Sequence, residues 1–467
     1  MQIPILRDAP VVSACARNFR DIFANSSQYT HFKDYLTGLI GLDNKSFASI
    51  STCVVDSSDA TNLGRFFGNR DWDGKLVNQD RIRSMREQTR KFRRGAKRSA
   101  LIIDDTMCEH VGNLFEFIDN HYDHTTSGYI WAHNPVTSHY VSGRVRFPLD
   151  FRLYRRYEEF TDWESFVHRY FPDVEIPRKK KVRDNFKKQV EQTLLQDPLF
   201  RARHEEFKTK ITFAKELVKM AIELNLPFSL VLFDGWYLAP ELLQLLASLH
   251  LDWISLLKKN RKVLTRSLTI YDRDGELIQF ENKEIKIEDL LPLIPKSAFH
   301  PRKINGTVYW GFSTTAVIPS IGKVRLVISF GNSELEGTCC ILVTNRIDWE
   351  AKRILTGYLE RWPIETFYQD SKQYLGLGDY QMRKMIAIQN HWYLVFLSYS
   401  LLHLDILNSS LKKGENRLQT IGEACRHQSQ ALGKSLVLWV HRQLSKGSRV
   451  ESIMDTLYPK SSKLCVA

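Results

Sequence analysis

The sequence predicts an α/β fold, in which a mixed sheet has helices on both faces, is interrupted by a β-rich insertion, and is flanked by helical N- and C-terminal domains. Apolar runs that end in an acidic residue, such as Phe228–Phe233 before Asp234, are typical of strands covered on both faces. Between residues 262 and 340, alternating segments separated by Gly, Asp, Asn and Pro indicate antiparallel strands. The charged, helix-like sequence near both ends predicts the flanking domains.

These patterns also divide the chain, because 467 residues are too many for one ordinary hydrophobic core. The predicted units are a helical domain at 1–98, the first part of the core at 99–261, a β-strand insertion at 262–339, the second part of the core at 340–380, and a helical C-terminal domain at 381–467. Within the core, we expect strands over Ala100–Ile103, Tyr129–His133, Arg144–Tyr154, Phe228–Phe233, Trp253–Leu257 and Cys340–Thr344. A charged helical region is expected from about 157 to 224, and another helical pattern begins near Trp349.

The net charge of +13, from 66 Lys and Arg against 53 Asp and Glu, favours a polyanionic partner, although a merely basic enzyme would also fit. The strongest basic stretch runs from Arg81 to Arg98. On a helix, spacings of three and four would place several of its cations on one face. We take Arg90, Arg93 and Arg94 as candidate DNA contacts, with a solvated helix face as the alternative. A second basic cluster runs from Arg178 to Lys188.

Several classes of protein are disfavoured. The seven cysteines are scattered and form no C-x-x-C pair, which argues against a disulfide framework or a zinc ribbon. The longest apolar stretch, Leu394–Leu402, is too short to span a bilayer, and no signal pattern begins the chain. We therefore expect a cytoplasmic protein without membrane contact. Five histidines fit no common zinc spacing and are interpreted as surface or hydrogen-bonded residues: His110, His121, His124, His133 and His139.

Acidic residues at strand ends give the first chemical signal. Asp105 and Asp234 each follow an apolar run, and sheet edges of this kind form ligand-binding crevices. Carboxylates suit Mg²⁺, a hard cation that prefers oxygen ligands. Asp residues at strand ends also serve commonly in turns and helix caps, so these two positions need support from elsewhere in the chain.

That support lies around Glu365, where the spacing is Y-x2-R-x3-E-x6-K. The members of this pattern are Tyr358, Arg361, Glu365 and Lys372. On a continuous helix the last three would share a face. Pro363 could instead mark the helix start, which would place Glu365 in the first turn and bring Tyr358 and Arg361 from the preceding segment. Either arrangement offers a carboxylate flanked by cations that can hold phosphates.

This segment resembles the YREK signature of bacterial insertion-sequence DDE transposases, in the IS-four-like superfamily and its IS-seven-oh-one branch. Asp105-Thr106 and Phe233-Asp234-Gly235 resemble the family's first and second catalytic motifs. The β-rich region before Glu365 resembles the insertion in its ribonuclease-H-like core. The resemblance covers roughly residues 99 to 380 and implies a ribonuclease-H-like sheet.

The resemblance implies a role for each matching residue. Asp105, Asp234 and Glu365 would be catalytic and would bind two Mg²⁺ or Mn²⁺ ions, with Asp104 as a competitor for the first position. Contacts to DNA phosphates would come from Tyr358, Arg361 and Lys372. Trp310, in the insertion, could stack on a flipped base, with core packing as the alternative.

The expected function is cut-and-paste DNA transposition. Such a bacterial, nucleoid-associated enzyme would cleave double-stranded DNA at terminal inverted repeats and join the 3′-hydroxyl ends to target DNA. Joining two ends together implies a homodimer in the DNA complex. Two alternatives remain: a transposase-derived, non-catalytic DNA-binding protein, and a metal-dependent endonuclease of the same fold without strand transfer.

Overall fold

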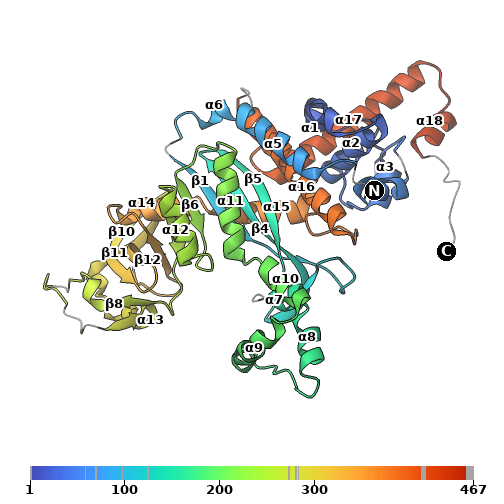
Figure 1. The fold of residues 1–467 in the computed structure, drawn as a ribbon. Coiled ribbons are helices and arrows are strands. Elements are labelled where there is room, and N and C mark those ends of the chain that lie inside the picture. Colours follow the sequence, from blue (N-terminus) through green and yellow to red (C-terminus); the bar gives the residue numbers. More distant parts are fainter. Residues whose placement is uncertain are drawn as a thin grey trace.

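The computed structural model describes residues 3–57, 59–68, 71–96, 98–123, 126–271, 274–278, 281, 283–411 and 417–458. Lys97, His124 and Cys465, which belong to patterns considered above, lie outside these residues. Figure 1 shows a large sheet in the middle of the chain, with the helices of both ends gathered on one side of it.

Five strands in the order β5–β4–β1–β6–β7 form the centre of the sheet. They span Ser99–Asp105 (β1), Gly128–Ser142 (β4), Val145–Tyr154 (β5), Leu230–Phe233 (β6) and Asp252–Leu256 (β7). Strands β1, β6 and β7 are parallel, whereas β4 is antiparallel to both β1 and β5. This mixed sheet with helices around it is consistent with a ribonuclease-H-like fold, so the predicted fold class is confirmed. Two short strands, β2 (Cys108–Glu109) and β3 (Asp119–Asp123), pair with the first half of β4.

The β-rich insertion extends this sheet. Strand β13 (Cys340–Thr344) pairs antiparallel with β7, and β12 (Gly322–Phe330), β11 (Thr307–Ile318) and β10 (His300–Ile304) follow in antiparallel order. A separate two-stranded sheet joins β8 (Lys262–Leu264) and β9 (Glu284–Lys286), followed by the short α13 (Ile287–Leu290). Within the region where alternating segments predict strands, Leu268–Tyr271 forms none apart from an isolated bridge between Tyr271 and Leu277, among the described residues.

Alternating side chains divide the central strands between two apolar layers, as strand geometry requires. Leu101 and Ile103 of β1 pack with α11 (Lys210–Glu223) and α12 (Pro240–Ser248). Ala100 and Ile102 belong to the other layer, with α14 (Ala351–Leu359), α15 (Trp362–Leu375) and α16 (Met385–Ser409). The sheet therefore has helices on both faces (Figure 1).

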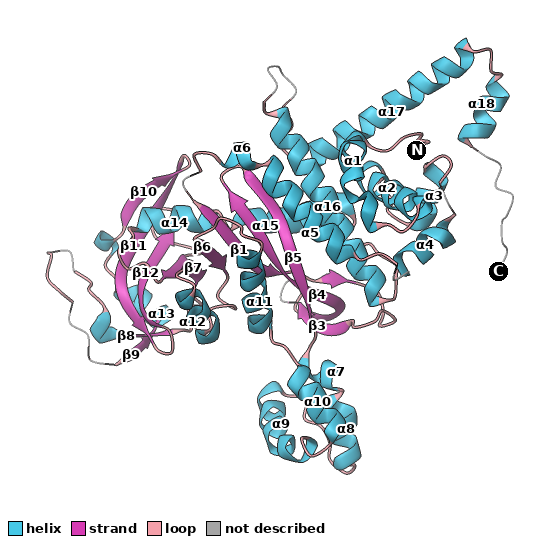
Figure 2. Cartoon of the chain, turned by 45° about the horizontal axis from the view of Figure 1, so that its top comes forward, coloured by secondary structure: helices cyan, strands magenta, loops and turns pink. Residues whose placement is uncertain are grey.

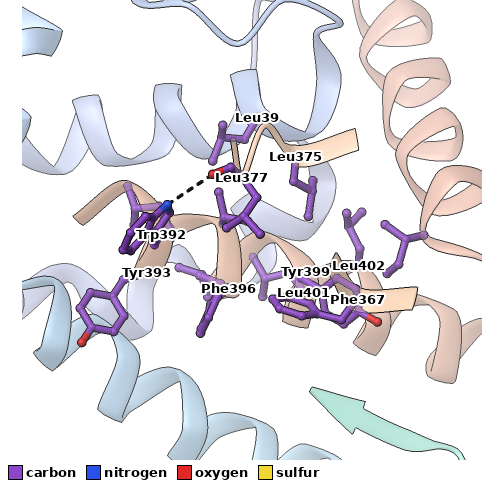
Figure 3. Close-up of a cluster of buried hydrophobic side chains, with 14 of the residues drawn as sticks. Leu39, Phe367, Leu375, Leu377, Trp392, Tyr393, Phe396, Tyr399, Leu401 and Leu402 are labelled. Atoms are coloured by element: carbon purple, nitrogen blue, oxygen red, sulfur yellow. Dashed lines mark hydrogen bonds between the residues drawn. The ribbon is translucent and has the colours of Figure 1, made fainter. Parts of the chain in front are cut away.

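The helices of the two chain ends share one apolar core. The N-terminal helices are α1 (Pro10–Cys15), η1 (Ala16–Ile22), α2 (Ser26–Gly41), α3 (Phe47–Cys53), α4 (Ala60–Gly68), α5 (Gly74–Gln88) and α6 (Arg90–Arg93). At the other end lie α17 (Ile421–Ser445) and α18 (Val450–Leu457). Among the described residues, the shared core includes buried side chains of α17 but none of α6 or α18. Figure 3 shows Leu39 of α2 near Leu377 and α16, where the Trp392 indole N–H donates to the Leu377 carbonyl at 3.3 Å. This shared core braces α15 against the sheet.

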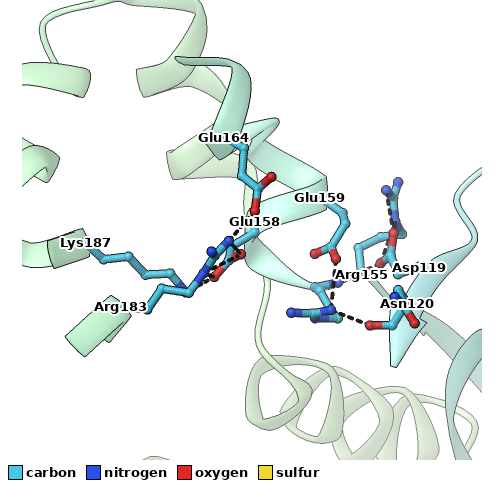
Figure 4. Close-up of polar contacts among 9 residues, drawn as sticks. Asp119, Asn120, Arg155, Glu158, Glu159, Glu164, Arg183 and Lys187 are labelled. Carbon is cyan, nitrogen blue, oxygen red and sulfur yellow. Dashed lines mark hydrogen bonds and ion pairs between the residues drawn. The ribbon is translucent and has the colours of Figure 1, made fainter. Parts of the chain in front are cut away.

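A small helical module projects from the sheet between β5 and α11 (Figure 2). It contains α7 (Tyr157–Thr161), α8 (Trp163–Tyr170), α9 (Lys180–Leu194) and α10 (Pro198–Glu206), which enclose their own apolar cluster around Trp163 and Phe166. Figure 4 shows Arg183 and Lys187 converging on Glu158, and Arg155 paired with Asp119 at 2.8 Å where the module leaves the sheet. No helix within the described part of the chain is both long and apolar enough to cross a membrane.

Candidate active site

The edge of the sheet at the ends of β1 and β6 gathers the predicted carboxylates. Ile103 of β1 lies opposite Phe233 of β6, and these two parallel strands end at the same edge. Asp105 ends β1, while Asp234 follows β6 directly. Helix α15 begins at Trp362, and Glu365 lies in its first turn, after Pro363. The second arrangement considered from the sequence is therefore the observed one, with Tyr358 on α14 and Arg361 at the N-cap of α15.

Arg361 connects the sheet to the start of α15. Its guanidinium pairs with Asp104 through Nη2, and its Nη1 lies 3.0 Å from Oε1 of Glu365. Burial raises the pKa of the Asp104 carboxyl to about 7; Arg361 opposes this rise, whereas Asp105, Asp234 and Glu365 reinforce it. The Asp104–Arg361 pair thus fixes the first turn that carries Glu365.

Asp105 has a different set of partners. Its Oδ2 accepts hydrogen bonds from Lys210 Nζ at 2.8 Å and Asn134 Nδ2 at 2.9 Å, and its Oδ1 accepts one from the Tyr237 hydroxyl at 2.7 Å. Burial alone would raise the pKa of Asp105, but Lys210 and the two neutral donors hold it below its usual value. Asp105 is therefore kept as a carboxylate.

Asp234 is held by the turn after β6. Its Oδ1 accepts the backbone N–H of Trp236 at 2.9 Å, and its backbone carbonyl accepts the Ser255 hydroxyl at 3.1 Å. Burial raises the pKa of Asp234, and the charge of Asp105 adds to the rise. Gly235 lets this turn approach β7, because a Cβ at that position would lie 3.0 Å from the Leu256 carbonyl oxygen.

The donor chemistry at this edge suits divalent cations. Four carboxylates share the edge, and repulsion among them contributes to the raised pKa of Asp104. A cation that prefers oxygen ligands would offset this excess of negative charge. In the described part of the chain, no three His, Cys, Asp or Glu side chains lie together closely enough to hold a metal ion. The fit to a metal rests on the carboxylate chemistry of these residues and on their place at the strand ends, and not on a preformed cluster among the described side chains.

The remaining members of the Glu365 pattern surround the carboxylates. The Tyr358 hydroxyl is buried and has no hydrogen-bond partner among the described residues. Lys372 of α15 donates a hydrogen bond from Nζ to the Met107 carbonyl, just after the end of β1, at 2.7 Å. Lys372 and Asp105 also line a surface cavity of about 580 Å³ beside the end of β1. The sequence pattern thus brought together residues that are neighbours in space.

The predicted basic stretch is not one helix, because α5 ends at Gln88 and α6 begins at Arg90. Its arginines nevertheless converge on a cavity of about 750 Å³, whose lining includes Arg83, Arg86, Arg90, Arg93 and Arg94. Arg81 is an exception, since its guanidinium is buried and bonded to Asn78, Ser400 and the Leu149 carbonyl. Ser99, at the start of β1, also lines the cavity, so the cavity lies about 20 Å from the carboxylate edge at about 3.3 Å per strand residue.

The remaining candidates from the sequence, Trp310 and the histidines, are described by their packing and hydrogen bonds. Trp310 is partly buried in β11 and packs against an apolar layer of the sheet. His133 is buried, with one ring nitrogen 2.8 Å from the Tyr380 hydroxyl and the other 2.9 Å from the Glu116 carbonyl. The interpretation of the histidines as surface or hydrogen-bonded residues holds for His133. It is wrong for His139, which is buried with neither ring nitrogen hydrogen-bonded among the described residues.

The sequence reasoning missed the three residues that hold Asp105. Tyr237 could have been found, because it lies three residues after Asp234 in the same turn. Lys210 and Asn134 carry no local signal, since α11 and β4 bring them to the site from distant parts of the chain. The exposed indoles of Trp236 and Trp362, beside Asp234 and Arg361, were also missed.

The family comparisons show that a chain with this fold and acidic sheet edge is a nuclease-type enzyme. The chain belongs to the DDE superfamily endonucleases, because the profile of that family matches residues 18–273, more than half of its length. The profile of the transposase DDE domain matches residues 208–401. No curated protein matches the chain. The expected membership of the DDE transposases is confirmed at this level, and these families act on DNA, usually with divalent metals.

Proposed function

We propose that this protein is a DNA transposase with the YREK signature, in the IS-seven-oh-one branch of the IS-four-like superfamily. It cleaves the ends of an insertion sequence and joins the 3′-hydroxyl ends to target DNA. The observation that carries the proposal is the placement of Glu365: it lies in the first turn of α15, joined through Arg361 to the strand that ends at Asp105. The two matching family profiles support the transposase class.

The proposed catalytic residues are Asp105, Asp234 and Glu365, which would hold two Mg²⁺ or Mn²⁺ ions. Bound ions of this kind activate the attacking oxygen and stabilise the leaving oxygen in phosphoryl transfer. Asp105 suits the first position because it is kept ionised and lines an open cavity. Asp104 is assigned a positioning role, since its carboxylate holds Arg361 and, through Arg361, the start of α15.

The proposed phosphate contacts at the active edge are Tyr358, Arg361 and Lys372. Lys372 is exposed beside the end of β1, where its ammonium can approach a DNA strand. Tyr358 has a buried hydroxyl without a hydrogen-bond partner among the described residues, and a phosphate oxygen would provide one. Arg361 would exchange part of its carboxylate pairing for phosphate when DNA is bound.

Arg90, Arg93 and Arg94 are the proposed contacts for the transposon end, together with the exposed cations of the Arg178 to Lys188 cluster. The Nε of Arg93 is buried and has no hydrogen-bond partner in the described part of the structure. A bound phosphate would accept a hydrogen bond from this N–H. The distance of about 20 Å to the carboxylate edge corresponds to about six base pairs at 3.4 Å each. One duplex end can therefore contact both places.

The rest of the proposal concerns assembly. Both ends of an element are joined in one reaction, so we propose a homodimer acting on paired terminal inverted repeats. The predicted unit boundaries at residues 98, 261, 339 and 380 are retained as part of this proposal. We also propose that the protein is cytoplasmic and associated with the bacterial nucleoid.

The decisive experiment measures cleavage and strand transfer on labelled DNA that carries the inverted repeats flanking the gene. With Mg²⁺, wild-type protein should join the labelled ends to a plasmid. Glu365→Gln should lower both steps more than about 100-fold, because even the outer-shell partners of metal ligands cost 10- to 100-fold. Binding of the ends should survive, since the helix and its neighbours remain.

Three other results would contradict the proposal. Full activity of Glu365→Gln would remove the proposed mechanism. Cleavage by the wild type without joining would identify a metal nuclease, and binding without either step would identify a non-catalytic DNA-binding protein.

A triple variant tests the end-binding surface in the same assay. Changing Arg90, Arg93 and Arg94 to Glu should strongly weaken end binding and reduce the slope of log affinity against log salt by about 0.9 for each lost phosphate contact. The matched control changes three exposed cations to Glu: Lys434 and Arg442 of α17, and Lys446 at its C-cap. Equal loss in both variants would show a general charge effect and remove the assigned role of the α6 region.

A further inference from the structure

The indole of Trp236 is exposed beside the proposed catalytic carboxylates. It is 57% exposed, whereas Trp163, Trp253 and Trp392 are buried in the apolar clusters. Its position is fixed by its own backbone, because the Trp236 N–H donates to Asp234 Oδ1 at 2.9 Å. The contact of Gly235 with the end of β7 fixes the same turn from the other side. The ring is thus an exposed apolar surface on a constrained backbone.

Two lysines lie against this ring. Lys258 Nζ is 5.0 Å and Lys210 Nζ is 5.8 Å from the ring centroid, within the range of cation–π attraction. The ammonium of Lys210 also bonds to Asp105 at 2.8 Å. Trp236 is therefore connected to both strand ends of the site, through Asp234 on one side and through Lys210 to Asp105 on the other.

An exposed indole with cations beside it suits a ligand that has a flat π surface and negative charge. A nucleotide has both, because every base offers a π face and its phosphates can pair with lysines. Bases within a duplex are already stacked on each other, so only an unpaired or flipped base is available to the ring. The carboxylates next to Trp236 are those at which a DNA strand is proposed to be cut.

We propose that Trp236 stacks on an unpaired DNA base next to the cleaved phosphate, while Lys258 contacts a neighbouring phosphate. This inference rests on the proposed function and deepens it by naming a base-stacking contact outside the YREK pattern. The ammonium of Lys210 has three N–H donors, so it can contact the same DNA strand while it stays bonded to Asp105.

The test compares two labelled 15-nucleotide probes with equal phosphate number, oligo(dT) and an abasic strand, by fluorescence anisotropy with the full-length protein. Trp236→Ala should weaken oligo(dT) binding roughly 5- to 150-fold, the range expected for loss of one stacked base, and leave abasic binding unchanged. Trp236→Phe should retain most of the affinity. Lys258→Gln should weaken both probes and lower the salt dependence, because it removes a phosphate contact.

Tyr458→Ala is the control, since this exposed aromatic residue lies at the end of α18, remote from β6 (Figure 1). Equal loss of both probes in Trp236→Ala, or no loss, would overturn the stacking role. A change in oligomeric mass in Trp236→Ala would overturn it too, by showing that the ring contacts a second copy of the chain. If Trp236 stacks oligo(dT) but the wild type neither cuts nor joins ends, the proposed function fails while the stacking contact stands.

Discussion

The two faces of β1 give adjacent aspartates opposite surroundings. Asp104 faces α15, where it shares the single guanidinium of Arg361 with Glu365. Asp105 faces α11, where Lys210 pairs with it and two neutral donors complete its hydrogen bonds. Burial raises the pKa of Asp104 to about 7, whereas the pKa of Asp105 lies below its usual value. Strand alternation, which reverses the face at each residue, is the cause.

This difference indicates separate roles for the two aspartates, metal binding and positioning of α15, which the sequence alone does not distinguish. The Asp104 face carries more negative than positive charge, and its one cation holds the helix start in place. The Asp105 face balances its carboxylate fully and leaves it beside an open cavity. A residue that binds a metal must be ionised and accessible, and Asp105 meets both conditions. Asp104 instead acts as a link between the sheet and α15.

The largest expected effect separates the two aspartates by activity. Asp105→Asn should lower DNA cleavage at least about 100-fold, as expected for a lost metal ligand. Asp104→Asn should lower it less than about 10-fold, because an amide oxygen can still accept a hydrogen bond from Arg361 and keep Glu365 in position. The measurement is single-turnover cleavage of labelled ends at saturating protein. Both variants should bind the ends as the wild type does, which controls for misfolding.

The opposite ranking of these two variants would assign the first metal position to Asp104. Equal and large losses would show that both carboxylates are needed at the reacting phosphate, and the distinction between the two faces would then fail.

Much of the core could be predicted because its signals are local. The apolar run of β6 ends at Asp234 as its sequence indicates, and Pro363 marks the start of the helix that carries Glu365. Such signals depend only on strand and helix periodicity and on the backbone of proline. The order of the strands could be predicted only through the family resemblance, because pairing across the sheet leaves no local pattern.

The unpredicted features depend on distant partners. Arg81 looks like part of a basic surface, yet Asn78, Ser400 and the Leu149 carbonyl satisfy its guanidinium inside the protein. Lys210 reaches Asp105 from a helix 105 residues away in the chain. The insertion joins the main sheet because β13 pairs with β7, a contact that alternation alone does not specify. Sequence patterns identify the exposed and apolar faces of a helix or strand, but they do not show which two elements pack together.

The two aspartates should also differ, by a smaller amount, in how they make the free energy of unfolding depend on pH. The folded-state pKa of Asp104, about 7, lies above its ordinary value of 3.8, so its contribution to stability is complete below about pH 4 and is lost as pH rises through 7. The folded-state pKa of Asp105 is lowered, so its contribution is present above pH 3.8 and is lost only in stronger acid. Between pH 5 and 7, the two substitutions should therefore respond differently to pH.

Urea unfolding in EDTA at pH 5, 6 and 7 measures this difference on metal-free protein. Relative to the wild type, Asp104→Asn should gain stability as pH rises, by at most about 1.4 kcal/mol for each pH unit, because the variant no longer has a carboxyl that must ionise in a crowded site. Asp105→Asn should be destabilised by a nearly constant amount over the same range, since Lys210 loses its charged partner at every pH tested. Parallel pH profiles for the two variants would show that the faces of β1 do not differ in charge balance, and the separate roles argued for Asp104 and Asp105 would lose their physical basis.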